Sequence, residues 1–179
     1  MGQKKVGFKS VLVLALVALS VLSACSRAPE TTQSTNVANG WITFQGNWTA
    51  NGTKDTLRLG GERRATLTSF DGTLFLSGNS SLGVGFRSEA VVFNDTSTGM
   101  IGRAVWTDDK GNKIFSELHG QDTASGKNVA GTFLGGTGPY TGATGSYAFT
   151  WRFVIDTEDG RVQGQTDDVS GRIKVGQQS

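Results

Sequence analysis

The chain has 179 residues, which suits one domain of ordinary size, and it carries 17 Lys and Arg against 15 Asp and Glu. Nucleic acid is excluded as a partner, because its binding needs clustered Lys and Arg and Arg63-Arg64 is the only basic pair after residue 25. With one cysteine and one histidine, we expect no disulfide framework, no metal site, no cofactor and no His-based catalytic residues.

Residues 1–24 are predicted to be an export signal. Lys4, Lys5 and Lys9 precede an apolar run from Val11 to Leu22, which is shorter than the roughly 20 residues that span a bilayer. With these three lysines removed, 14 of the 17 basic residues remain beside the 15 acidic ones, so the mature chain is close to neutral.

The end of this segment, Leu22-Ser23-Ala24-Cys25, resembles the bacterial lipobox. The resemblance implies cleavage before Cys25 and acyl chains on that residue, so that the membrane is a partner through a lipid anchor. Ser26 after the cysteine resembles the default that sends lipoproteins to the outer membrane, facing the periplasm or the cell surface. An ordinary secretory signal with a coincidental cysteine is the alternative.

Residues 25–40 are predicted to be the lipidated N-terminus and a flexible linker. The segment from Ser26 to Gly40 holds no large apolar residue except Val37, so it cannot contribute to a core.

Residues 41–176 are predicted to form an all-β domain. Side chains alternate between apolar and polar most clearly from Ser146 to Ile155, and Ile42, Phe44 and Trp48 share one face of a first strand. Ala65 and Leu67 suggest a short strand that turns at Asp71-Gly72 into a return strand with Leu74 and Leu76. Further strands are expected at 85–94, 99–107, 113–120, 127–134 and 161–175, the last of them interrupted near Asp167-Asp168.

About eight sequential antiparallel strands have two stable arrangements, a closed barrel or a two-sheet sandwich. Closure removes exposed strand edges, and the 26 glycines suit the bends of a small barrel and oppose helices. We therefore predict an eight-stranded antiparallel barrel.

A glycine-rich segment lies before the most regular strand. Its spacing fits no phosphate-binding loop, and no helix follows it, so we interpret it as a corner in which Tyr140 folds back as a plug. The corner residues are Gly135, Gly136, Thr137, Gly138, Tyr140 and Gly145.

The run GGTGPYTGATG, followed by an aromatic strand, resembles the corner of allene oxide cyclase-like and dirigent-like β-barrels. The preceding GNKIFSELHG is similar to the segment before that corner, and the resemblance covers roughly residues 100–153. It implies a calycin-like barrel fold. No catalytic residue of the plant cyclases can be placed on this chain.

The interior of such a barrel is either filled or open to a small apolar ligand. The large candidates for it are Trp41 or Trp48, Phe44, Phe86, Trp106, Phe115, Phe133, Phe149, Trp151 and Phe153. If Phe115 points inward, Glu117 and His119 line a pocket with it, and Arg103 is a plausible neighbour. If Ile114, Ser116 and Leu118 point inward instead, Glu117 and His119 are solvated, which we favour. With the inward alternative kept open, the possible pocket residues are Arg103, Trp106, Phe115, Glu117, His119, Phe149 and Trp151.

The expected function is that of a membrane-anchored module that binds a small hydrophobic molecule or serves as a scaffold, without catalysis. The alternative is an isomerase or cyclase that confines an apolar substrate, as the barrel resemblance implies.

Overall fold

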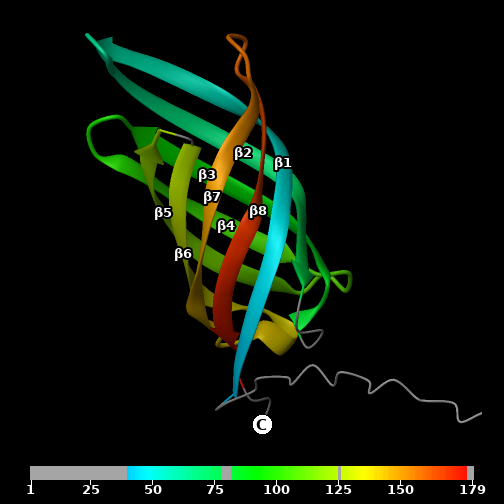
Figure 1. Ribbon diagram of the computed structural model, residues 1–179. Helices are drawn as coiled ribbons and strands as arrows, with labels where there is room; N and C mark the ends of the chain where they lie inside the picture. Colours follow the sequence, from blue (N-terminus) through cyan, green and yellow to red (C-terminus); the bar gives the residue numbers. More distant parts are fainter. Residues whose placement is uncertain (1–39, 78–81, 125, 177–179) are drawn as a thin grey trace, which may run out of the picture. The chain divides into compact units, whose positions relative to one another are not determined.

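The computed structural model describes residues 40–77, 82–124 and 126–176 (Figure 1). The predicted export signal, Cys25 and almost all of the linker lie outside the described residues. Within the part that is described, no helix is both long and apolar enough to cross a membrane.

Eight antiparallel strands follow one another around a closed barrel, in which β1 pairs with both β2 and β8. One short 3-10 helix, η3 (Gly138–Tyr140), lies between β6 and β7. The predicted eight-stranded antiparallel barrel is thus confirmed. The strands are β1 (Trp41–Gly60), β2 (Arg63–Ser77), β3 (Gly85–Asp95), β4 (Gly99–Thr107), β5 (Lys113–Thr123), β6 (Gly126–Gly136), β7 (Thr144–Asp156) and β8 (Arg161–Lys174).

Alternate residues of each strand face the barrel interior, as the period of two requires. In β7, Tyr147, Phe149 and Trp151 are buried, and the pattern fades towards Ile155, which is exposed. The inward side chains form one hydrophobic core that includes Phe44, Trp106 and Phe133.

The predicted turn at Asp71-Gly72 is wrong. Strand β2 continues through both residues, which pair with Asn51 and Ala50 of β1, and the chain turns at Gly61 and Glu62, directly after Gly60. Gly60 and Gly61 have φ values of +99° and +58°, a conformation that glycine adopts without steric cost. Gly72 is needed for a different reason: the backbones of β1 and β2 approach closely there, and a Cβ at Gly72 would lie 2.1 Å from the Thr49 carbonyl oxygen.

The predicted interruption of the last strand is a β-bulge. Gly46 pairs with Val169 and Trp48 with Thr166, so Asp167 and Asp168 together face a single residue of β1. The Asp168 carboxylate accepts a hydrogen bond from the Thr150 amide at 2.9 Å. The strand bends at this point and continues.

Glycines on the inner face make room for aromatic rings. Gly131 and Gly171 are the two cross-strand partners of Tyr147. A Cβ at Gly131 would lie 2.2 Å from the Tyr147 ring, and one at Gly164 would lie 2.3 Å from the Trp151 ring. These positions allow large side chains to fill a narrow barrel.

The two ends of the barrel differ. The β1–β2 and β7–β8 hairpins lie at one end, at the top of Figure 1, and the corner between β6 and β7 lies at the other. At the corner, Tyr140 is buried, and its hydroxyl donates to the Leu82 carbonyl at 3.3 Å. Burial, together with the nearby Asp108, raises the pKa of Tyr140 to about 12. This end is therefore closed by a neutral aromatic side chain.

The backbone of the corner is fixed by the residues around η3. Thr137 and Lys113 exchange two hydrogen bonds of 2.8 Å, one to the Lys113 carbonyl and one to the Thr137 hydroxyl. Gly135, Gly138 and Gly145 have positive φ. Gly136 has another role, since a Cβ there would lie 2.3 Å from the Lys113 carbonyl oxygen.

Candidate functional site

The half of the barrel opposite the corner contains a cavity of about 300 Å³. Residues near the open-end termini of the strands line it, among them Thr56, Thr66, Asn94, Asp122 and Asp156, so the cavity reaches the mouth of the barrel. Its volume lies at the lower end of the range for small-molecule sites.

The half of the barrel next to the corner is filled. Trp106 contacts Phe133 and Tyr147, with ring centroids 5.3 and 4.8 Å apart, and Ser116 Oγ shares a buried hydrogen bond of 2.7 Å with the Tyr147 hydroxyl. A second void, between these side chains and the cavity, has about 20 Å³, which is room for one water at most. Trp48, Leu118 and Phe149 line both spaces and so form the floor of the cavity.

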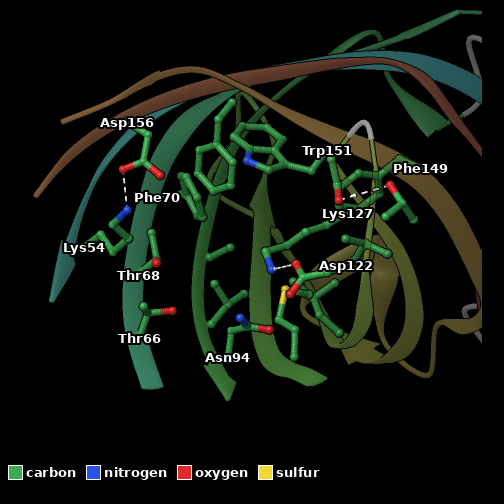
Figure 2. A pocket seen from close by; sticks show the side chains of 18 of the residues that line it. Lys54, Thr66, Thr68, Phe70, Asn94, Asp122, Lys127, Phe149, Trp151 and Asp156 are labelled. Atoms are coloured by element: carbon green, nitrogen blue, oxygen red, sulfur yellow. Dashed lines mark hydrogen bonds and ion pairs between the residues drawn. The ribbon is translucent and has the colours of Figure 1, made fainter. Parts of the chain in front are cut away.

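One wall of the cavity is aromatic. Trp151 lies against Trp48 and Phe70, with ring centroids 4.6 and 5.0 Å apart, and Trp48 is 5.8 Å from Phe149. Figure 2 shows Phe70, Phe149 and Trp151 around the cavity. Such a wall offers rings against which a flat apolar molecule can pack.

The remaining walls are mixed. Aliphatic side chains come from β3 to β6, and three polar residues, Thr66, Thr68 and Asn94, come from neighbouring inward positions of β2 and β3 (Figure 2). Thr68 is buried. The aliphatic residues are Ala90, Val92, Met100, Leu118 and Val129.

Three residues that line the cavity carry buried polar atoms without a hydrogen-bond partner among the described residues. They are Trp48 and Trp151, through Nε1, and Asn94, through Oδ1. Unpaired buried polar atoms are uncommon in folded proteins. All three belong to residues that line the same cavity, so this half of the barrel is less completely packed and hydrogen-bonded than a solid core would be.

The mouth of the cavity carries charge. Lys54 forms an ion pair with Asp156, and Lys127 forms one with Asp122 (Figure 2). Arg64, which also lines the mouth, forms no ion pair with any residue in the described ranges.

The sequence-predicted pocket residues fall into three groups. Phe149 and Trp151 line the cavity, whereas Trp106 lies in the filled half. The third group, Arg103, Phe115, Glu117 and His119, faces outward, because Ile114, Ser116 and Leu118 are the inward residues of β5. The inward alternative for Glu117 and His119 is therefore wrong.

On the outer face, Glu117 is the centre of a small polar cluster. Its carboxylate lies 2.6 Å from His119 Nε2 and 2.8 Å from Arg103 Nη2. The hydrogen bond with His119 and the charge of Arg103 lower the pKa of Glu117. This cluster lies on the outer face of the barrel and lines neither the cavity nor the void beneath it.

Sequence reasoning missed Phe70 and the charged mouth. Lys54 shares the inward parity of Trp48 and Ala50, and Lys127 shares that of Val129, so the strand period could have placed both lysines inside. The described residues contain no cluster of three or more His, Cys, Asp or Glu side chains that could hold a metal ion.

No protein-family model and no curated protein matches the chain. Among solved structures, the barrel is similar to a pterocarpan synthase dirigent protein, with 11% identity, a TM-score of 0.48, and coverage of 79% of this chain and 91% of that one. It is also similar to pyocyanin demethylase, with 16% identity, a TM-score of 0.42, and coverage of 72% and 98%. These similarities concern the fold and give neither a ligand nor a reaction for this chain.

Proposed function

We propose that this protein is a lipid-anchored component of the bacterial cell envelope whose barrel binds a small, mainly apolar molecule without converting it. The observation that carries the proposal is the contrast between the two halves of the barrel. One half is filled by interlocked aromatic rings, and the other surrounds about 300 Å³ of open space with rings, aliphatic side chains and a few polar groups.

A binding role is favoured over a scaffold role because a scaffold gains nothing from an open half. Leaving space beside Trp48 and Trp151 forfeits packing contacts, and leaving their buried nitrogens unpaired costs further stability. A bound ligand can supply the missing packing contacts and hydrogen bonds, and largely apolar cavities with a few polar groups are typical ligand sites.

Binding is also favoured over turnover. Five ionisable residues line the cavity, and four of them are joined in two ion pairs, Lys54 with Asp156 and Lys127 with Asp122; the fifth is Arg64. The polar groups deeper in the wall, on Thr66, Thr68 and Asn94, do not titrate near neutral pH. Lys127 lies beside the aromatic wall as the cross-strand partner of Trp151, but its ammonium is held in the ion pair with Asp122, so the described residues offer no unpaired acid or base at that wall.

The anchoring part of the proposal rests on the sequence around Cys25. A short apolar run after three lysines, and small residues directly before the only cysteine, support removal of the signal and acylation of Cys25. With Ser26 following, we propose the outer membrane as the destination.

Ligand binding is tested with N-phenyl-1-naphthylamine, a neutral aromatic probe whose fluorescence rises in apolar surroundings. We expect saturable binding by the protein and its loss in Ala90→Phe, which places a ring in the cavity. Val92→Phe is a second blocking variant, and Ala130→Phe adds the same ring to an exposed position of the outer face. Circular dichroism verifies that each variant is folded. Equal probe binding by folded Ala90→Phe and Ala130→Phe would refute the cavity as the site.

Anchoring is tested by growing bacteria that express the full chain with radiolabelled palmitate. We expect label in the protein and its recovery with membranes, and both should be lost in Cys25→Ser. Ser26→Ala is the control, since it changes the neighbouring residue and leaves the sulfur in place. If wild type and Cys25→Ser are labelled equally, the anchor is not on this cysteine.

A further inference from the structure

The chemistry of the cavity changes with depth. Its floor and one wall are aromatic, with Trp48, Phe149 and Trp151; its middle carries the hydroxyls of Thr66 and Thr68 and the amide of Asn94. Its mouth carries charges of both signs. A ligand complementary to this gradient has a flat apolar body and a polar group at one end.

The cations at the mouth lie further inside than the anions. The side chains of Lys54 and Lys127 are 20% and 15% exposed, whereas those of their partners Asp156 and Asp122 are 42% and 58% exposed. Lys54 is the cross-strand partner of Thr68 and Lys127 that of Trp151, so both lysines start from inward positions within the cavity, and each aspartate lies nearer the solvent. Viewed from inside the cavity, the mouth is therefore lined by ammonium groups.

A third cation gives the mouth an excess of positive charge. Arg64 lines it beside Lys54 and Lys127, and within the described part of the chain two carboxylates, Asp122 and Asp156, line it with them. Both carboxylates are already paired with the lysines, and no acidic side chain of the described residues lies within ion-pair distance of Arg64. The Arg64 guanidinium thus has donors available for an anionic group, and its planar geometry suits a carboxylate or a sulfonate.

Strand parity separates Arg64 from its neighbour. Arg63 faces the outer side of β2, where its Nη2 lies 3.1 Å from Asp95 Oδ2. Arg64 is on the parity of Thr66, Thr68 and Phe70, the inward residues of the same strand. Two consecutive arginines therefore have different surroundings, one already paired and one at the mouth of the cavity.

We infer that the ligand of this cavity is an aromatic anion, whose ring packs against Trp48 and Trp151 and whose anionic group is held by Arg64 with Lys54 and Lys127 nearby. This inference rests on the proposed binding function and specifies its ligand class. The volume of about 300 Å³ limits the ligand to a small molecule. A neutral ligand would not neutralise the excess positive charge of the mouth, whereas an anionic one would.

The test uses two probes with the same ring skeleton. N-phenyl-1-naphthylamine is neutral, and 8-anilino-1-naphthalenesulfonate carries one sulfonate on that skeleton. Fluorescence titration of the full chain should show tighter binding of the sulfonate. Arg64→Gln should weaken the sulfonate about tenfold and leave the neutral probe within about twofold, since a charge-assisted contact of about 1.4 kcal/mol is lost.

Arg63→Gln is the matched control, because it removes the same charge one residue away on the outer face, and it should change neither titration. Lys127→Gln should weaken the sulfonate in the same direction as Arg64→Gln. If both probes bind equally and Arg64→Gln affects neither, the anionic class is wrong and the binding function stands. If neither probe binds wild type, or if Ala90→Phe binds both as wild type does, the proposed binding function itself fails. Equal losses in Arg63→Gln and Arg64→Gln would assign the effect to overall charge and overturn the role of the mouth.

Discussion

The filled half of the barrel makes a strong prediction at its buried hydrogen bond. Ser116 Oγ and the Tyr147 hydroxyl lie 2.7 Å apart, and both residues are buried. Burial raises the pKa of Tyr147, so its hydroxyl stays protonated throughout the neutral range. Tyr147→Phe leaves the serine without this partner, and Ser116→Ala does the same to the tyrosine. Each single variant should lower the free energy of unfolding by about 1–3 kcal/mol.

The double variant Ser116→Ala/Tyr147→Phe removes both polar groups and leaves none unpaired. Its loss should be close to that of one single variant, so the coupling energy in the cycle should be at least about 1 kcal/mol. Urea unfolding followed by tryptophan fluorescence measures all four free energies. Additive losses, with coupling within about 0.3 kcal/mol, would refute the reasoning, because they would show that the two hydroxyls do not depend on each other.

Two further predictions concern stability. Gly131→Ala should destabilise the protein by about 1–3 kcal/mol in urea unfolding, because its Cβ would lie 2.2 Å from the Tyr147 ring in a packed interior, whereas Gly85→Ala, whose Cβ would have no neighbour closer than 3.8 Å, should change stability little. Hydrogen bonds from Ser97 and then Arg63 lower the pKa of Asp95 to about 2, below the value of about 3.9 for an unfolded chain. Its contribution to stability should therefore be complete above the unfolded value and be lost as the pH falls towards 2. Comparing urea midpoints of wild type and Asp95→Asn across this range should show the difference shrinking with acid, and a constant difference would contradict the assignment.

The fold could be predicted where inward positions are hydrophobic. Strand β7 places Tyr147, Phe149 and Trp151 at alternate positions, and its period is visible without any structure. The outer half of β1 has no such pattern. Its inward positions hold Gly52, Lys54 and Thr56, so the sequence there resembles a polar loop although the residues form a continuous strand, and the pattern predicts the turn at Asp71-Gly72 instead.

The site could be predicted only in part, because the face on which a side chain lies depends on the register of its strand. Glu117 and His119 share a face with Phe115, and a half-buried Phe115 on the outer face makes that face look like the interior. The cavity also depends on residues distant in sequence, such as Trp48 and Trp151, which β8 brings together by pairing with both β1 and β7. No local pattern contains that information.

The failure of the hydrophobic pattern and the presence of the cavity have the same cause. Towards the corner, the inward positions carry large rings, so the strands are easy to recognise and the interior is solid. Towards the hairpins, the inward positions of β1 and β2 carry Lys54, Thr56, Thr66 and Thr68, so the strands are hard to recognise and the interior is open. The first strand also begins at the solid end, where Trp41 pairs with Lys174. The chain therefore enters β1 at the closed end of the barrel, and the mouth, where Arg64 has no ion-pair partner among the described residues, lies at the other end.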